Sequence, residues 1–142
     1  MTEHDSTKTA DGALSRFTNA RNAALIAARK ALGVNEVDAR ALLYIAAHPG
    51  TRPTHLRDHL GITSAGVTTM IDRLAGRGVV QRDVDADDRR VNLITLAVDL
   101  DADPWDALTR FDVRLAAAAV ALGVDANESF GRTLDDLVAA TY

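Results

Sequence analysis

The spacing of apolar residues predicts two helices in the first third of the chain. From residue 11 onward, one helical face carries Leu14, Phe17, Leu25, Ala28 and Leu32. Gly33 ends this pattern, and Asn35 can cap a second helix that stops before Pro49. Residues 1–10 are polar and aperiodic, and we expect them to form a flexible N-terminus.

Two shorter helices are predicted in the middle of the chain. Thr54 can cap a helix from His55 to Leu60, and Gly61 can end it in the left-handed conformation that glycine adopts at low cost. Thr63 can cap the next helix, in which apolar residues recur at helical spacing. These residues are Val67, Met70, Ile71 and Leu74, and Ile62 with Val67 can form a hydrophobic staple.

The opposite side of this fourth helix is chemically different from its apolar stripe. It carries small, hydroxylated or guanidinium-bearing residues, namely Ala65, Gly66, Thr68, Thr69 and Arg73. Such a face is thin enough to enter a groove of DNA and can hydrogen-bond to base edges. After Gly78, two valine-rich and leucine-rich runs predict strands at 79–84 and 91–94, joined by a charged tip.

The last third of the chain returns to helical spacing. Asp103-Pro104 is a helix start with proline at the first position, and the helix is expected to continue to Gly123. Asp125 and Glu128 have the spacing of a capping pair for a final helix. A small domain cannot cover the apolar faces of all these flanking helices, so we expect them to pack against a second copy of the chain.

The middle of the chain resembles the winged helix-turn-helix of the MarR family of transcriptional regulators. The matching parts are the helix Ser64–Leu74, the turn Arg77–Val80, and Asp88-Arg89-Arg90 followed by Ile94 and Leu96. The resemblance implies a mainly α fold with a small β-wing, with a winged helix-turn-helix at about 35–97. It also implies dimerisation helices at about 11–33 and 103–140, in one domain over 11–142.

The implied function is sequence-specific binding of double-stranded DNA. In this reading a homodimer occupies a pseudo-palindromic operator as a repressor, and a small organic effector releases it. Thr68, Thr69 and Arg73 would lie near bases in the major groove, and Ser64 and Arg77 near phosphates. The resemblance places the wing residues Asp88, Arg89 and Arg90 at the DNA, with Arg90 in the minor groove and Asp88 orienting it.

Composition narrows the other possibilities. The formal net charge is −4, but residues 97–142 carry three basic and nine acidic side chains, whereas residues 51–96 carry seven and six. The near-neutral winged region therefore fits modest, salt-sensitive DNA binding. The chain has no cysteine, no long apolar run and no signal-peptide pattern, so we expect a cytoplasmic protein without disulfides. No nucleophile–base pair is recognisable, and we expect neither an enzyme nor a bound cofactor.

Two alternatives stay open at this level. His55 and His59 are four residues apart, a spacing that can place two imidazoles on one metal ion. The protein would then be a metal-responsive regulator. Alternatively, the winged region is a protein-interaction module without DNA binding, with the acidic C-terminal helices as its docking surface.

Overall fold

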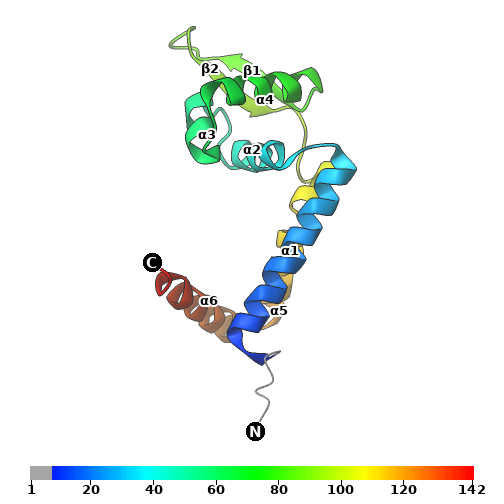
Figure 1. Cartoon of the computed structure of the whole chain (residues 1–142), viewed down its shortest axis with the longest axis vertical. Helices are drawn as coiled ribbons and strands as arrows, with labels where there is room; N and C mark the ends of the chain where they lie inside the picture. Colours follow the sequence, from blue (N-terminus) through cyan, green and yellow to red (C-terminus); the bar gives the residue numbers. More distant parts are fainter. Residues whose placement is uncertain (1–7) are drawn as a thin grey trace. The chain divides into compact units, whose positions relative to one another are not determined.

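The computed structural model describes residues 8–142 and divides the chain into two units, one ending at Leu108 and one comprising Thr109–Tyr142 (Figure 1). The first unit contains four α-helices, a β-hairpin and a 3₁₀ turn, and the second contains two α-helices. These elements confirm the predicted mainly α fold with a small β-wing.

The first helix, α1, spans Ala10–Leu32. Its start is capped by Thr9, whose hydroxyl accepts a hydrogen bond from the Gly12 amide at 3.2 Å. The cap and the first turn therefore include the last residues of segment 1–10, which was expected to be flexible. The rest of that segment, residues 1–7, lies outside the described residues. Gly33 ends the helix with φ 64°, as the sequence predicts.

The second helix, α2, spans Glu36–Ala47 and begins with a reciprocal cap. The Asp38 amide donates to Asn35 Oδ1 at 2.8 Å, and the Asn35 amide donates to Asp38 Oδ2 at 3.3 Å. This arrangement confirms the cap predicted at Asn35 and adds a second partner to it. On the inner face of the helix Ala41, Leu42 and Ile45 are fully buried.

The third and fourth helices form the helix-turn-helix. Helix α3 spans Pro53–Leu60, so the predicted start at His55 with Thr54 as the cap is wrong. Proline lacks an amide hydrogen and has a fixed φ, and both properties suit the first helical position, which places Thr54 inside the helix. Helix α4 spans Ser64–Gly76, and the predicted Thr63 cap is confirmed because its hydroxyl accepts from the Gly66 amide at 3.0 Å.

A two-stranded antiparallel hairpin forms the wing. Strand β1 spans Val80–Val84 and β2 spans Asn92–Leu96, with Val80 opposite Leu96. Thr51 makes an isolated antiparallel bridge to Ile94, at the edge of the hairpin. In Figure 1 the wing and α4 lie at the end of this unit that is farthest from the start of α1.

The core of the first unit joins the helix-turn-helix to the wing. Most of its fully buried side chains come from α2, α3, α4 and β2, and they include Leu42, Ile45, Leu56, Met70, Leu74 and Ile94. Each such side chain contributes about 1.5–3 kcal/mol through removal from water. All four apolar positions predicted for the α4 stripe are buried. The opposite side of α4 must therefore face solvent.

The region after the wing differs from the sequence-based expectation. The continuous helix predicted from Pro104 to Gly123 is wrong, since Trp105–Leu108 is a 3₁₀ turn, η2, and α5 spans only Arg110–Ala121. Leu108 is buried in the first unit, where η2 packs on α1, and this packing interrupts the helical run.

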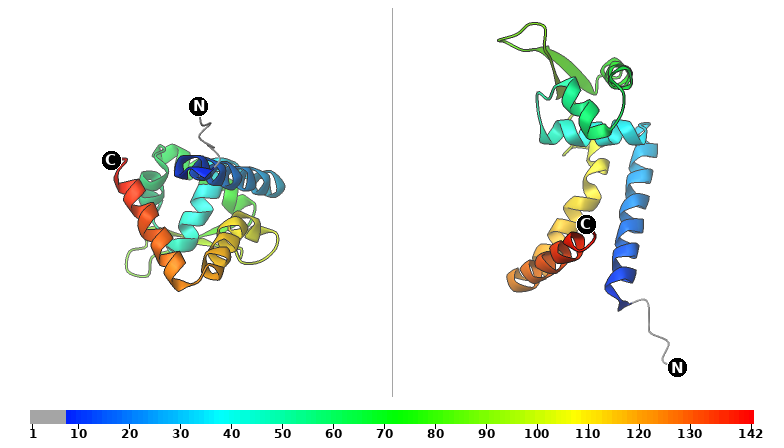
Figure 2. Two further views of the ribbon diagram at one scale, coloured as in Figure 1. Left: turned by 90° about the horizontal axis from the view of Figure 1, so that it is seen from below. Right: turned by 60° about the vertical axis from the view of Figure 1, so that its left-hand side comes forward.

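The last helix, α6, spans Val124–Ala139 and follows Gly123, which lies at the N-cap with φ 90°. The predicted capping pair of Asp125 and Glu128 is absent because the helix begins before Asp125. Figure 2 shows α5 and α6 as consecutive helices at the C-terminal end of the chain. Neither helix contains a buried residue. Within residues 8–142, none of the helices combines the length and apolar character required to span a bilayer.

Candidate nucleic-acid interface

The outer face of α4 presents small side chains to solvent. Ser64, Ala65, Thr68 and Thr69 are all exposed, as expected for the side opposite the buried stripe. The Thr68 hydroxyl donates to the Ser64 carbonyl at 3.1 Å. Hydroxyl and methyl groups of this kind can contact base edges and the thymine methyl in a major groove.

Gly66 contributes space to this face rather than a side chain. A Cβ atom at this position would lie 3.2 Å from Thr63 Oγ1 and 3.7 Å from Ile62 Cδ1. The side chains of Thr63 and Ile62 therefore occupy the volume that a larger residue would need. The structure thus gives Gly66 a local packing role that offsets its low helix propensity.

Arg73 has a partner inside the protein. Its Nε donates to Asp38 Oδ2 at 3.3 Å, and its Nη2 pairs with Asp38 Oδ1. The Asp38 side chain is only 3% exposed, whereas that of Arg73 is 41% exposed. The hydrogen bond to Asp38 raises the pKa of the Arg73 guanidinium, although partial burial acts in the opposite direction. The expected base-reading arginine is thus tied to α2.

Arg77, expected near phosphates, is exposed, but its guanidinium also has partners within the protein. Its Nη2 donates to the Leu32 carbonyl at 2.7 Å, and its Nη1 donates to the Gly33 carbonyl at 2.9 Å. The last carbonyls of a helix lack partners within the helix and carry a partial negative charge. Arg77 therefore satisfies the C-terminal end of α1 from the C-terminal end of α4.

The wing tip is exposed and carries the expected arginine–aspartate pair. Asp88 Oδ1 accepts from the Arg90 amide at 3.0 Å and from Arg90 Nε at 3.4 Å, and the Arg90 side chain is 93% exposed. Arg89 is also exposed. Asp85 Oδ1 accepts from the Asp87 amide at 2.8 Å, which shapes the turn that precedes these arginines.

The two histidines considered as metal ligands are placed differently from each other. His59 stacks on the ring of Tyr44 with centroids 4.3 Å apart, and His48 stacks on Tyr44 at 4.2 Å. Both histidines are exposed on α3, and the ring contact holds His59 against α2. Across the described residues 8–142, no three His, Cys, Asp or Glu side chains gather where they could hold a metal ion.

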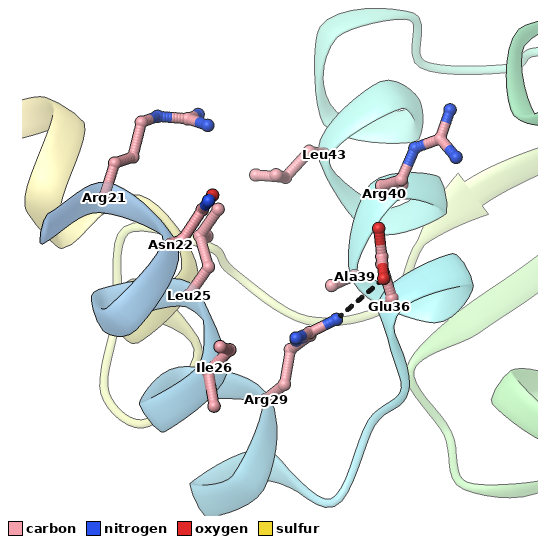
Figure 3. Close-up of a pocket in the computed structure, with 9 residues that line it drawn as sticks. All are labelled: Arg21, Asn22, Leu25, Ile26, Arg29, Glu36, Ala39, Arg40 and Leu43. Atoms are coloured by element: carbon pink, nitrogen blue, oxygen red, sulfur yellow. Dashed lines mark ion pairs between the residues drawn. The ribbon is translucent and has the colours of Figure 1, made fainter. Parts of the chain in front are cut away.

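A pocket of about 530 Å³ lies between α1 and α2 (Figure 3). Arg21, Arg29 and Arg40 line it together with one acidic residue, Glu36. The Arg40 guanidinium turns away from α1, and its Nη2 donates to the His59 carbonyl at 3.3 Å. Arg29 Nη1 lies 3.5 Å from Glu36 Oε2. Leu25, Ile26 and Leu43 supply apolar lining, so the pocket combines a positive rim with aliphatic walls.

Sequence reasoning overlooked Asp38 and the charged contacts of α4. Asp38 follows Asn35 by three residues, which is the spacing of a capping box, and that pattern was its only local signal. Its pairing with Arg73 spans 35 positions of the chain and has no counterpart in local spacing. Asp72, the remaining charged residue of α4, pairs with Arg82 of β1.

A capped helix-turn-helix followed by a two-stranded wing defines this unit as a winged helix-turn-helix. Residues 32–91, which include α2, α3, α4 and β1, match the model of the MarR family. This match supports the resemblance to that family over residues 32–91.

Solved structures of MepR from Staphylococcus aureus share the fold. MepR bound to ethidium bromide gives a TM-score of 0.71 at 19% identity, covering 94% of this chain and 97% of that one. MepR, a transcription regulator of the multidrug efflux pump MepA, gives 0.64 at 17% identity over 94% and 99% of the two chains. The MepR–DNA complex gives 0.62 at 18% identity over 90% and 96%. No curated protein matches this sequence.

Proposed function

We propose that this protein is a transcriptional regulator that binds double-stranded DNA as a homodimer on a pseudo-palindromic operator. The observation that carries the proposal is the placement of the exposed hydroxyl face of α4 and the exposed arginines of the wing in one unit with a common core. A groove-reading helix and a flanking wing are the parts that such a regulator needs. The related fold of MepR has been solved in complex with DNA, which supports the same use here.

The DNA-contacting residues divide into two groups in this proposal. Thr68 and Thr69 lie near bases in the major groove, and Ser64 at the start of α4 lies near a phosphate, where helix amides favour negative charge. Arg89 and Arg90 supply the positive charge from the wing, with Arg90 in the minor groove and Asp88 orienting it. This division places the cationic contacts mainly on the wing.

Dimerisation through the flanking helices is supported by their exposed apolar side chains. Helices α5 and α6 bury no residue in the single chain. They expose large apolar side chains, which include Val113, Leu115, Val120, Phe130, Leu137 and Val138. A two-helix unit with no buried residue is expected to gain its stability by association, and a second copy of the chain supplies matching surfaces.

Repression is relieved in this proposal by a small organic effector bound in the pocket between α1 and α2. Three arginines and one glutamate line the pocket and give it a net positive charge, and its aliphatic walls suit an apolar body. An organic anion fits both properties. The pocket joins an expected dimerisation helix to the first helix of the DNA-binding part, so a ligand there contacts both functional regions.

The test is binding of the intergenic duplex next to the protein's own gene, compared with a duplex of random sequence across a salt series. We expect tighter binding of the intergenic duplex and a linear fall of log affinity with log salt concentration for both. The exposed wing variant Arg89→Gln should reduce the salt slope, which is the slope of log affinity against log salt concentration, by about one, as expected for the loss of a single phosphate contact. Failure of the wild type to bind either duplex would leave the protein-interaction alternative as the better explanation.

A further inference from the structure

Every charged side chain in the second half of α4 and at its C-cap has a partner within the protein. Asp72 pairs with Arg82 of β1, Arg73 with Asp38 of α2, and Arg77 with two carbonyls at the end of α1. The remaining exposed side chains of the helix are neutral. The recognition helix therefore offers hydroxyl and methyl groups to a ligand, while its cations face neighbouring elements.

The partners of Arg73 and Arg77 lie close together in the sequence. They belong to the segment Leu32–Asp38, which joins α1 to α2 and which we term the α1–α2 corner. Asp38 acts twice in this corner, because its Oδ2 accepts from the Asn35 amide and from Arg73 Nε, each at 3.3 Å. One carboxylate thus caps α2 and holds α4.

The energetics oppose a role for Arg73 as a direct reader of guanine. Bidentate contact with a guanine through the Nε edge of the guanidinium would use the donors now bound to Asp38. Withdrawal of the guanidinium would leave the Asp38 carboxylate buried without its charged partner, which is costly in a low-dielectric interior. The same reasoning applies to Arg77, since its removal would leave the Leu32 and Gly33 carbonyls without these donors.

We infer that Arg73 and Arg77 are positioning residues that fix α4 to the α1–α2 corner, and that base discrimination by α4 rests on its neutral face at Ala65, Thr68 and Thr69. The inference rests on the proposed DNA-binding function. It assigns a positioning role to Arg73 and Arg77, which were expected to contact bases and phosphates. Because the corner follows α1 directly, it also links the orientation of the recognition helix to the expected dimerisation helix.

The decisive experiment is a double-mutant cycle between Asp38 and Arg73, read out as affinity for the random-sequence duplex and as its salt slope. Asp38→Asn is the key variant because the side chain is buried on α2 and retains an oxygen that can cap α2. We expect Asp38→Asn and Arg73→Gln each to weaken binding on the order of tenfold. This factor lies in the middle of the range of interaction energies between residues in contact. The double variant should bind the duplex at least as tightly as the single variant with the lower affinity.

The salt slope separates positioning from phosphate contact. The salt slope should stay unchanged in Asp38→Asn, Arg73→Gln and Arg77→Gln. The exposed control Arg89→Gln should lower the slope by about one, as expected for the loss of one phosphate contact. Selection of bound sequences from the random pool should show weaker enrichment for these three variants, but the same preferred bases. Thr69→Ala should change the preferred base at one position.

Several results would overturn the inference. Additive losses in the double variant, a slope reduced by Arg73→Gln, or unchanged binding by Asp38→Asn would show that Arg73 contacts DNA directly. If Arg73→Gln does not fold, as judged by circular dichroism, Asp38→Asn alone decides through its affinity and slope. Absence of duplex binding by the wild type would overturn the proposed function together with this inference, whereas wild-type binding without the coupling would overturn the inference alone.

Discussion

The carboxylate of Asp38 in α2 and the guanidinium of Arg73 in α4 form an ion pair between helices, with Nε 3.3 Å from Oδ2. The acid is almost fully buried and the base is partly exposed. The pair therefore lies at the edge of the core, where α4 meets the start of α2. Its position makes the recognition helix depend on a contact that lies outside the helix-turn-helix itself.

Removal of one partner should affect stability unequally. Arg73→Met should lower the free energy of unfolding by about 1–3 kcal/mol because it leaves a buried carboxylate without its charged donor. Asp38→Asn should cost less, since the amide oxygen keeps the cap at Asn35 and the guanidinium can be solvated. Urea denaturation of both variants measures the difference, and an equal or reversed order would contradict this account.

Thr54 and Thr63 were both predicted as helix caps, but only Thr63 should contribute to stability as a cap. Thr63→Ala removes the acceptor of the Gly66 amide and should cost about 0.5–2 kcal/mol. Thr54→Ala is the matched control, because Thr54 lies inside α3 and is exposed, and it should change stability by less than about 0.5 kcal/mol. Thermal or urea unfolding tests both, and comparable losses would argue against the observed start of α3.

Two glycines with open surroundings should respond to alanine in opposite directions. Gly61 has φ 65°, so Gly61→Ala should destabilise by about 1–2 kcal/mol through the left-handed conformation alone. Gly76 is the last residue of α4, and a Cβ atom added there would meet nothing within 4 Å, so Gly76→Ala should stabilise by about 0.5–1 kcal/mol. Chemical denaturation gives the sign of each change, and the same sign for both would contradict the assignment.

The apolar surface of α6 should be needed for association. The wild type should be a dimer in light scattering at micromolar concentration, and Phe130→Glu should shift it toward monomer by placing a charge in the expected interface. Val84→Glu on the wing is a matched control, since Phe130 is 56% exposed and Val84 is 58% exposed. A dimer that survives Phe130→Glu but dissociates with Val84→Glu would place the interface on the wing.

The wing and the recognition helix should contribute differently to DNA binding. Arg90→Gln should weaken binding to AT-rich duplexes generally, without changing the preferred major-groove bases. Thr69→Ala should cost about 0.5–1.5 kcal/mol on a preferred sequence and relax discrimination at one base pair. Affinities for a panel of single-base variants of the preferred sequence decide this, and a base-specific effect confined to Arg90→Gln would reverse the two roles.

The sequence by itself determined the features that depend on neighbours within one helical turn. The cap at Thr63, the cap at Asn35 and the stop at Gly33 each involve groups at most four residues apart. The buried stripe of α4 was equally accessible, because a helical repeat places its apolar residues on one side whatever they pack against. The wing followed from its alternating apolar residues and its resemblance to a known family.

Only the tertiary structure decided where the long charged side chains of α4 go. Periodicity places Arg73 and Arg77 on the exposed side of the helix, but a guanidinium can reach sideways to a partner 35 or 45 positions away. Packing also decided the interruption at Leu108, whose burial replaces the predicted continuous helix with a 3₁₀ turn. Both outcomes depend on contacts between segments that no local pattern records, since those contacts exist only after the chain has folded.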